Sequence, residues 1–133
     1  MNWQVIILLM FYMIGFSSCI NDKTPVEAEY RKINAEEAYQ MMQSTDGFIL
    51  VDVRTAEEFN ERHIKGALLI PVNEINVRAV DELPDKNALI LVYCRSGARS
   101  ANAAYDLVDM GYTNVYDFGG ILNWPYETVD KSS

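Results

Sequence analysis

The chain has 133 residues, a length that suits about one domain with a buried core. Half of its residues are hydrophobic and 23% are charged, which is typical of a folded globular protein. Eleven basic against nineteen acidic residues give a net charge of −8, so no general positive field attracts nucleic acid. We therefore do not expect a nucleic-acid partner.

Residues 1–19, MNWQVIILLMFYMIGFSSC, contain no charged side chain. Their apolar part is about 14 residues long, which fits a signal peptide and is short for a membrane-spanning helix of about 20 residues. Small residues lead into Cys19, as at the end of a bacterial lipoprotein signal, where the cysteine is lipidated. The alternatives are an uncleaved anchor and cleavage without a lipid. In each case we expect an exported domain, and the lipoprotein interpretation makes it periplasmic and anchored to a membrane.

The remaining chain is expected to form one domain between two short flanking segments. Residues 20–29 are polar, include Pro25 and are expected to be a linker. The domain is assigned to residues 30–128, and residues 129–133 are a C-terminal tail.

The domain is predicted to begin with a strand, a helix and a second strand. Residues 30–33 are an expected edge strand. Asn34 and Glu37 have the spacing of a capping box, which predicts a helix through about Gln43. The run FILVDV at 48–53 is nearly all apolar and predicts a buried strand.

A shorter helix follows the buried strand. Thr55 can cap it, and the acidic pair at 57–58 lies in its first turn, where negative charge favours the helix dipole. Residues 67–72 are then predicted to form a strand and residues 73–83 a helix.

The last part of the domain repeats this alternation. Residues 88–93, ALILVY, predict a third apolar strand, and residues 98–110 predict a helix that ends at Gly111, a common residue after a helix. Residues 114–117 are the expected last strand, and a short helix is expected around Trp124.

Strands that alternate with helices and are nearly all apolar indicate an α/β fold, with a parallel sheet covered on both faces. Ligands of such sheets bind outside the carboxyl ends of the strands. Cys94 directly follows the strand at 88–93, so we expect it at this edge of the sheet.

The loop CRSGARS at 94–100 has the composition of an anion-binding site. Gly97 allows a sharp turn, and the helix that follows begins with free backbone N–H groups. Its cationic and hydroxyl side chains are Arg95, Ser96, Arg99 and Ser100. Together these groups would stabilise a sulfur anion at Cys94.

Other interpretations of these residues remain open. Cys94 can be a small buried hydrophobe, although two arginines follow it within five positions. His63, the only histidine, can be structural or can form a dyad with the cysteine. One histidine and two cysteines do not supply the usual ligands of a metal site, so we expect no metal and no cofactor.

Four segments resemble, in order and spacing, the motifs of the rhodanese sulfurtransferases. They are VDVRTAEEF at 51–59, HIKGALLIPV at 63–72, CRSGARS at 94–100 and GGILNW at 119–124. The resemblance covers about residues 30–127 and implies a three-layer α/β/α fold with a central, mostly parallel sheet. Phosphatases and arsenate reductases of the same fold carry C-x5-R, whereas Cys94 and Arg99 enclose four residues, which favours sulfur chemistry.

The resemblance also implies roles for individual residues. Cys94 would be the nucleophile that carries a transferred sulfur as a persulfide, and the arginines of its loop would assist binding of an anionic donor such as thiosulfate. The implied substrate-binding residues are Arg95, Ser96, Gly97, Ala98, Arg99 and Ser100.

Residues outside the loop are implied to be structural. They are Asp52 and Arg54 of the DVR motif, and His63. We expect Asp52 to pair with an arginine of the loop and so to fix the shape of the loop. Trp124 is expected to pack in the core.

The sequence therefore predicts a monomeric sulfurtransferase that passes sulfane sulfur from a small anionic donor to cyanide, a thiol or a protein acceptor. The alternative is a binding or sulfur-carrier module built on the same loop. A redox role for Cys94 would require a resolving thiol from elsewhere.

Overall fold

The computed structural model describes residues 29–133. The predicted signal peptide with Cys19, and nearly all of the predicted linker, lie outside the described residues. Within residues 29–133, no helix combines the length and the apolar character needed to cross a membrane.

The centre of the fold is a five-stranded sheet in the order β1-β6-β5-β2-β4, and every neighbouring pair in it is parallel. A separate antiparallel pair is formed by β3 and β7. The strands are β1 (Arg31–Lys32), β2 (Ile49–Asp52), β3 (His63–Ile64), β4 (Leu68–Leu69), β5 (Ile90–Cys94), β6 (Val115–Gly120) and β7 (Thr128–Val129).

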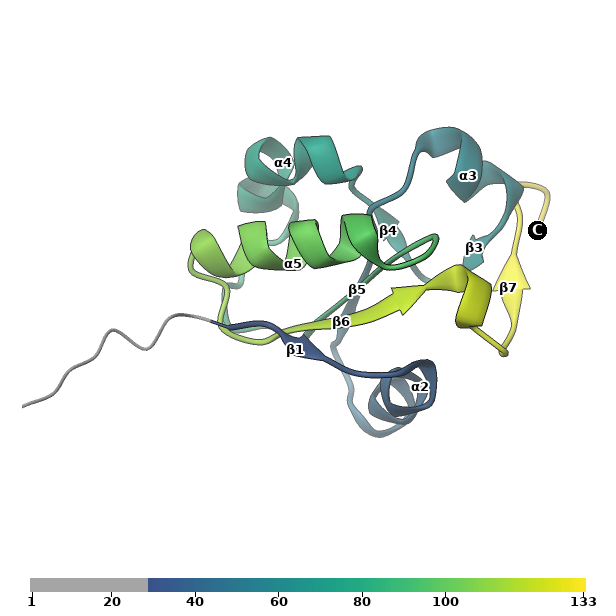
Figure 1. Cartoon of the computed structure of the whole chain (residues 1–133), viewed down its shortest axis with the longest axis horizontal. Helices are drawn as coiled ribbons and strands as arrows, with labels where there is room; N and C mark the ends of the chain where they lie inside the picture. The colour runs from purple at the N-terminus through teal and green to yellow at the C-terminus, as the bar shows by residue number, and fades with distance from the viewer. Residues whose placement is uncertain (1–28) are drawn as a thin grey trace, which may run out of the picture.

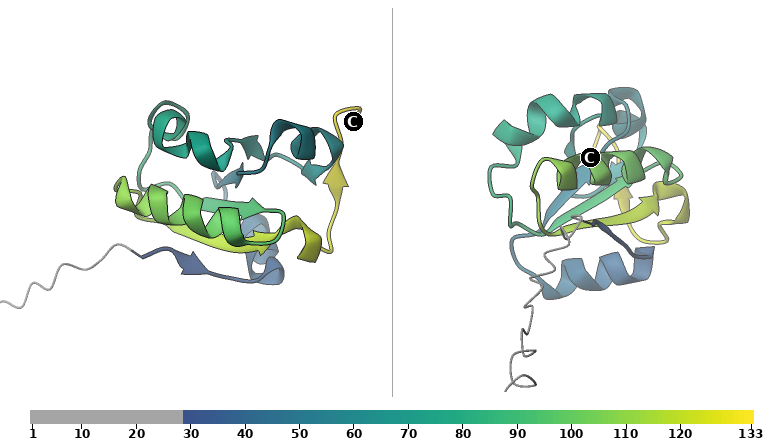
Figure 2. Two further views of the ribbon diagram at one scale, coloured as in Figure 1. Left: turned by 45° about the horizontal axis from the view of Figure 1, so that its top comes forward. Right: turned by 60° about the vertical axis from the view of Figure 1, so that its left-hand side comes forward.

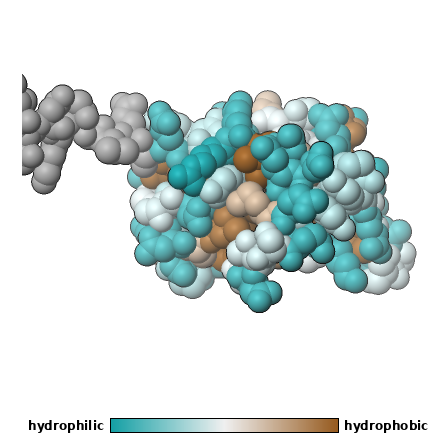
Figure 3. Space-filling model, turned by 90° about the horizontal axis from the view of Figure 1, so that it is seen from below, coloured by the Kyte–Doolittle hydropathy of each residue, from teal (hydrophilic) through white to brown (hydrophobic). Residues whose placement is uncertain are grey.

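Helices cover both faces of this sheet. The helices are α2 (Ala35–Ser44), α3 (Ala56–Glu61), α4 (Ile75–Glu82) and α5 (Ala98–Asp109), with 3-10 turns η1 (Val72–Glu74) and η2 (Ile121–Asn123). Figure 1 shows α4 and α5 above the sheet and α2 below it, and both views in Figure 2 agree. The predicted three-layer α/β/α fold is therefore confirmed. On the α2 side the surface is mostly hydrophilic, with hydrophobic residues visible only in small areas (Figure 3).

The two sides of the sheet have separate cores because side chains alternate along each strand. Leu91 and Tyr93 of β5 belong to the core on the α2 side. Ile90, Val92 and Cys94 belong to the core beneath α4 and α5. Cys94 therefore lies on the same side of the sheet as α5, the helix that begins just after the loop of Cys94.

Both predicted N-terminal caps are present. The side chain of Asn34 accepts a hydrogen bond from the Glu37 N–H at 2.8 Å, and the Glu37 carboxylate accepts from the Asn34 N–H at 2.8 Å. Thr55 and Glu58 form the same reciprocal pair at the start of α3, at 3.3 and 3.0 Å. These short patterns fix where the two helices begin.

Three predicted elements differ from the structure. The strand expected at 67–72 is only two residues long, and the helix expected at 73–83 begins with the 3-10 turn η1. The strand at 114–117 is not the last one, because β7 follows it and pairs with β3. Val129 of the predicted tail lies in β7. Two-residue strands are too short to show an alternating pattern, and their partner lies far away in the sequence.

Candidate active site

Cys94 ends the central strand β5 and is 1% exposed. The chain then turns through Gly97, whose φ of +116° is a conformation that side chains with a Cβ rarely adopt, and enters α5 at Ala98. The loop therefore curls around the cysteine, at the carboxyl edge of the sheet where the sequence places it.

The sulfur of Cys94 is surrounded by hydrogen-bonding groups. The Gly97 N–H donates to Sγ at 3.0 Å, and the thiol donates to Ser100 Oγ at 3.5 Å. Burial raises the pKa of the Cys94 thiol, but hydrogen bonds from Ser100, Gly97 and Ser96 outweigh burial and leave this pKa below its ordinary value. Backbone and hydroxyl dipoles thus favour the thiolate.

Ser100 also connects the loop to β6. Its hydroxyl lies within donating distance of two carbonyl oxygens, 3.1 Å from that of Gly97 and 3.2 Å from that of Gly119. Because a hydroxyl group rotates, the same proton can turn toward Sγ when the cysteine is a thiolate.

The glycine pair of β6 lies directly against the loop. A Cβ on Gly120 would stand 2.0 Å from the carbonyl oxygen of Arg95, so only glycine fits there. The Leu122 N–H donates to that same oxygen at 3.2 Å. The GGILNW segment therefore holds one side of the loop.

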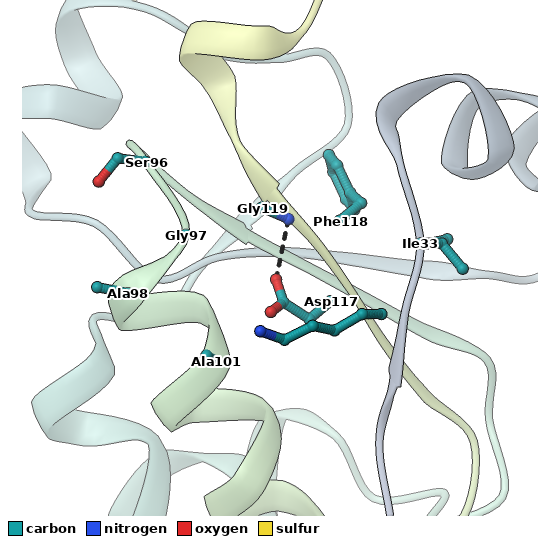
Figure 4. A pocket seen from close by; sticks show the side chains of 9 residues that line it. Ile33, Ser96, Gly97, Ala98, Ala101, Asp117, Phe118 and Gly119 are labelled. Carbon is teal, nitrogen blue, oxygen red and sulfur yellow. Dashed lines mark hydrogen bonds between the residues drawn. The ribbon is translucent and has the colours of Figure 1, made fainter.

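A cavity of about 450 Å³ lies beside the loop, between the end of β1, β6 and the start of α5. In Figure 4, Ser96, Gly97 and Ala98 border it on one side, and the Asp117 carboxylate points to Gly119. Asp117 accepts a hydrogen bond from the Gly119 N–H at 2.9 Å, a contact within β6 at the part of the strand that borders the cavity.

The guanidinium group of Arg99 forms an ion pair with Glu58. Its two terminal nitrogens donate to the two carboxylate oxygens of Glu58, at 2.7 and 2.9 Å. The hydrogen bond from Arg99 lowers the pKa of Glu58 to about 2; burial opposes this shift, and hydrogen bonds from Thr55 add to it. The pair is therefore fully ionised near neutral pH.

The prediction that Asp52 pairs with an arginine of the loop is wrong. Asp52 instead binds Arg54, whose Nη2 lies 2.7 Å from Oδ2, and the two side chains are 0% and 5% exposed. The Arg54 N–H also donates to Asp52 Oδ1 at 2.9 Å, an Asx-type turn that folds Arg54 back onto its own motif. The Nη2 atom of Arg54 also donates a hydrogen bond to the carbonyl oxygen of Arg62 at 2.6 Å. The DVR motif is thus a closed structural unit.

A second cavity, of about 370 Å³, lies between the DVR motif, helix α3, Arg95 of the loop and the turn η2. Its lining residues are Arg54, Glu58, Glu61, Arg62, Arg95, Ile121 and Leu122. Arg95 is exposed and, among residues 29–133, belongs to no ion pair. It is the loop arginine available to an anion in this cavity.

His63 and Trp124 both pack against aromatic side chains. The His63 ring stacks on Phe59 at 3.8 Å, and its Nδ1 is 2.8 Å from the Phe59 carbonyl oxygen. Trp124 is 8% exposed and packs against Phe118 and Tyr126. Within the described part of the chain, no group of three or more His, Cys, Asp and Glu side chains is placed to hold a metal ion.

Comparison with known proteins agrees with this geometry. The family described as "Rhodanese-like domain" matches residues 34–126. The chain belongs to the rhodanese-like family.

Other members of the family are named for sulfur transfer. The chain is 41% identical over 71 residues to thiosulfate sulfurtransferase PspE of Escherichia coli, covering 53% of this chain and 68% of that one. It is 38% identical over 94 residues to a sulfurtransferase of Allochromatium vinosum, covering 70% and 86%. A solved rhodanese with anions from E. coli is 36% identical with a TM-score of 0.59, covering 62% of this chain and 96% of that one.

Sequence reasoning missed two residues of this rhodanese-like site. Glu58 was assigned only to the first turn of its helix, although its place in the VDVRTAEEF segment was a usable signal. Gly120 enters the sequence analysis only as part of the GGILNW segment. Its φ of −126° is ordinary, so nothing but the close approach of Arg95 explains the glycine.

Proposed function

We propose that this protein is a sulfurtransferase that moves a sulfane sulfur from a small anionic donor such as thiosulfate, through a persulfide on Cys94, to a thiol or cyanide. The observation that carries the proposal is the buried Sγ of Cys94, which receives the Gly97 N–H at 3.0 Å inside a loop of further donors. The family membership and the names of the relatives support it.

In the first step the Cys94 thiolate attacks the sulfane sulfur of thiosulfate. A bond forms between Sγ and the sulfane sulfur, the S–S bond of the donor breaks, and its electron pair leaves with sulfite. The exposed guanidinium of Arg95 attracts the donor into the cavity in front of the loop.

In the second step an acceptor removes the outer sulfur. Cyanide attacks the persulfide sulfur, leaves as thiocyanate, and the electron pair of the S–S bond returns to Cys94 as a thiolate. A thiolate acceptor reacts in the same way and becomes a persulfide.

Lowering the pKa of the thiol alone contributes little to this reaction. A lower pKa raises the thiolate fraction near pH 7, but the lower basicity also reduces the nucleophilicity of the sulfur, so the two effects largely cancel. The larger benefit of the loop is that its N–H groups stabilise the negatively charged persulfide.

The test is steady-state sulfur transfer from thiosulfate to cyanide by the purified chain, with mass spectrometry of the protein after exposure to the donor alone. We expect turnover and the gain of one sulfur on Cys94, both lost in Cys94→Ser. Cys19→Ser is the matched control, because it removes the other cysteine and should keep both signals. A wild-type protein that neither turns over nor gains sulfur would instead be a binding module.

We also propose that the protein acts outside the cytoplasm, attached to a membrane through a lipid on Cys19. The uncharged apolar segment before Cys19 supports this proposal. Cells expressing the full chain and fed a labelled fatty acid should transfer label to the wild type and not to Cys19→Ser. Recovery of unlabelled wild-type protein in the cytoplasmic fraction would contradict the proposal.

A further inference from the structure

The two arginines of the loop are not equivalent. Arg99 donates with both terminal nitrogens to Glu58, and Arg95 belongs to no ion pair within the described part of the chain. Because Glu58 cancels the charge of Arg99, the loop presents one uncompensated guanidinium to a donor.

Glu58 is held in this position by its own helix as well as by Arg99. Its Oε2 accepts from the Thr55 N–H at 3.0 Å, and its own N–H donates to Thr55 Oγ1 at 3.3 Å. Its pKa of about 2, caused first by the hydrogen bond from Arg99, keeps it charged in any neutral assay. The carboxylate is therefore a fixed negative charge.

This charge borders the second cavity, the one of about 370 Å³ beside the loop. Glu58 lines that cavity together with Arg95, and its side chain is 26% exposed. Arg95 attracts a donor in the cavity, and Glu58 offsets the attraction that Arg99 would otherwise add.

We propose that Glu58 is a specificity-determining residue that disfavours doubly charged sulfur donors relative to singly charged ones. The inference rests on the proposed sulfurtransferase function and assigns to Glu58 the discrimination between donors of different charge.

Two donors of different charge react at the same atom. Thiosulfate carries two negative charges and releases sulfite when Cys94 attacks its sulfane sulfur. Methanethiosulfonate carries one negative charge, and the same attack breaks its S–S bond and releases methanesulfinate with the electron pair. Both reactions leave the same Cys94 persulfide, so their ratio reports only on donor recognition and the leaving group.

The size of the effect follows from Coulomb's law. At a separation of about 6 Å in water, one unit charge acting on another changes binding about threefold. Removal of the Glu58 charge should therefore favour a dianion about tenfold and a monoanion about threefold. The preference for thiosulfate over methanethiosulfonate should rise about threefold.

The variant that tests this is Glu58→Gln. Glutamine also serves at the third position of a capping box, so the start of α3 is kept. Glu57→Gln is the matched control, because it removes one negative charge from the same helical turn at an exposed residue that forms no ion pair in the described part of the chain. For each full-length variant, kcat/KM is measured with both donors at low and high salt.

We expect Glu58→Gln to raise kcat/KM for thiosulfate about tenfold, mainly through a lower KM, and to shift the donor ratio about threefold. The shift should shrink in 1 M salt, where the Debye length is about 3 Å, and Glu57→Gln should leave the ratio unchanged. An unchanged ratio, or an equal loss of activity with both donors, would overturn the inference while the sulfurtransferase function stands. A wild type that gains no sulfur from either donor would overturn both.

Discussion

Gly120→Ala tests whether the position of the loop controls catalysis. An alanine Cβ would stand 2.0 Å from the Arg95 carbonyl oxygen and 2.6 Å from Ser96 Cα, which are backbone atoms of the loop. Gly120 has φ −126° and ψ 151°, ordinary extended values, so the substitution introduces a clash and no backbone strain.

The clash has two measurable costs. Normal contact between carbon and oxygen is about 3.5 Å, so the loop must retreat by more than about 1 Å. Overpacking of this kind destabilises a protein by about 1 to 3 kcal/mol. A displacement of about 1 Å at a catalytic group can lower the rate about 100-fold. We therefore expect a modest loss of stability and a large loss of activity.

The assay combines kcat/KM for sulfur transfer, the midpoint of Cys94 alkylation against pH, and unfolding in urea. Gly120→Ala should lower kcat/KM about 100-fold and move the alkylation midpoint upward, because the Gly97 N–H moves away from Sγ. Gly47→Ala is the control. Its φ of +79° strains an alanine, but no atom other than those of its chain neighbours lies within 4 Å of the added Cβ. It should lose stability and keep its activity. Activity of Gly120→Ala within about threefold of the wild type would refute this reasoning.

Three further changes test other contacts. Ser100→Ala should raise the pKa of Cys94, since it removes a hydroxyl that stabilises the thiolate, and the alkylation midpoint should move to higher pH; an unchanged midpoint would contradict this role. Asp52→Asn should lower the free energy of unfolding in urea by about 3 to 5 kcal/mol because Arg54 would stay buried without its partner; a loss below about 1 kcal/mol would count against this account. Tyr126→Ala removes a ring that stacks on Tyr39 of α2, with 3.9 Å between the ring centroids, and should lower Tm by several degrees in calorimetry; an unchanged Tm would contradict a stabilising role for this stack.

Local patterns in the sequence were sufficient for much of the fold. The capping box at Asn34 and the cap at Thr55 indicated two helix starts, because the partners of these side chains lie three residues away. The apolar run before Cys94 placed the cysteine at the end of a central strand. These features depend on neighbours in the chain, so the sequence displays them directly.

Contacts between distant segments could not be predicted in this way. Arg99 and Glu58 are 41 positions apart, and no periodic pattern connects them. Asp52 had several arginines as candidate partners, and the turn at its own motif decided for Arg54. The pairing of β3 with β7 joins two strands of two residues each, which are too short to leave a recognisable signal.

The parallel sheet also determines the direction in which the active site faces. The described chain enters the sheet through β1, which runs parallel to β6, and β6 runs parallel to β5. Cys94 is the last residue of β5, so the cysteine and the start of β1 are at opposite ends of the sheet. Figure 1 shows the loop between β5 and α5 on the right and the start of β1 on the left. A donor or a large protein acceptor that comes to Cys94 would therefore approach the end of the sheet that carries the loop, away from the point where the described chain begins.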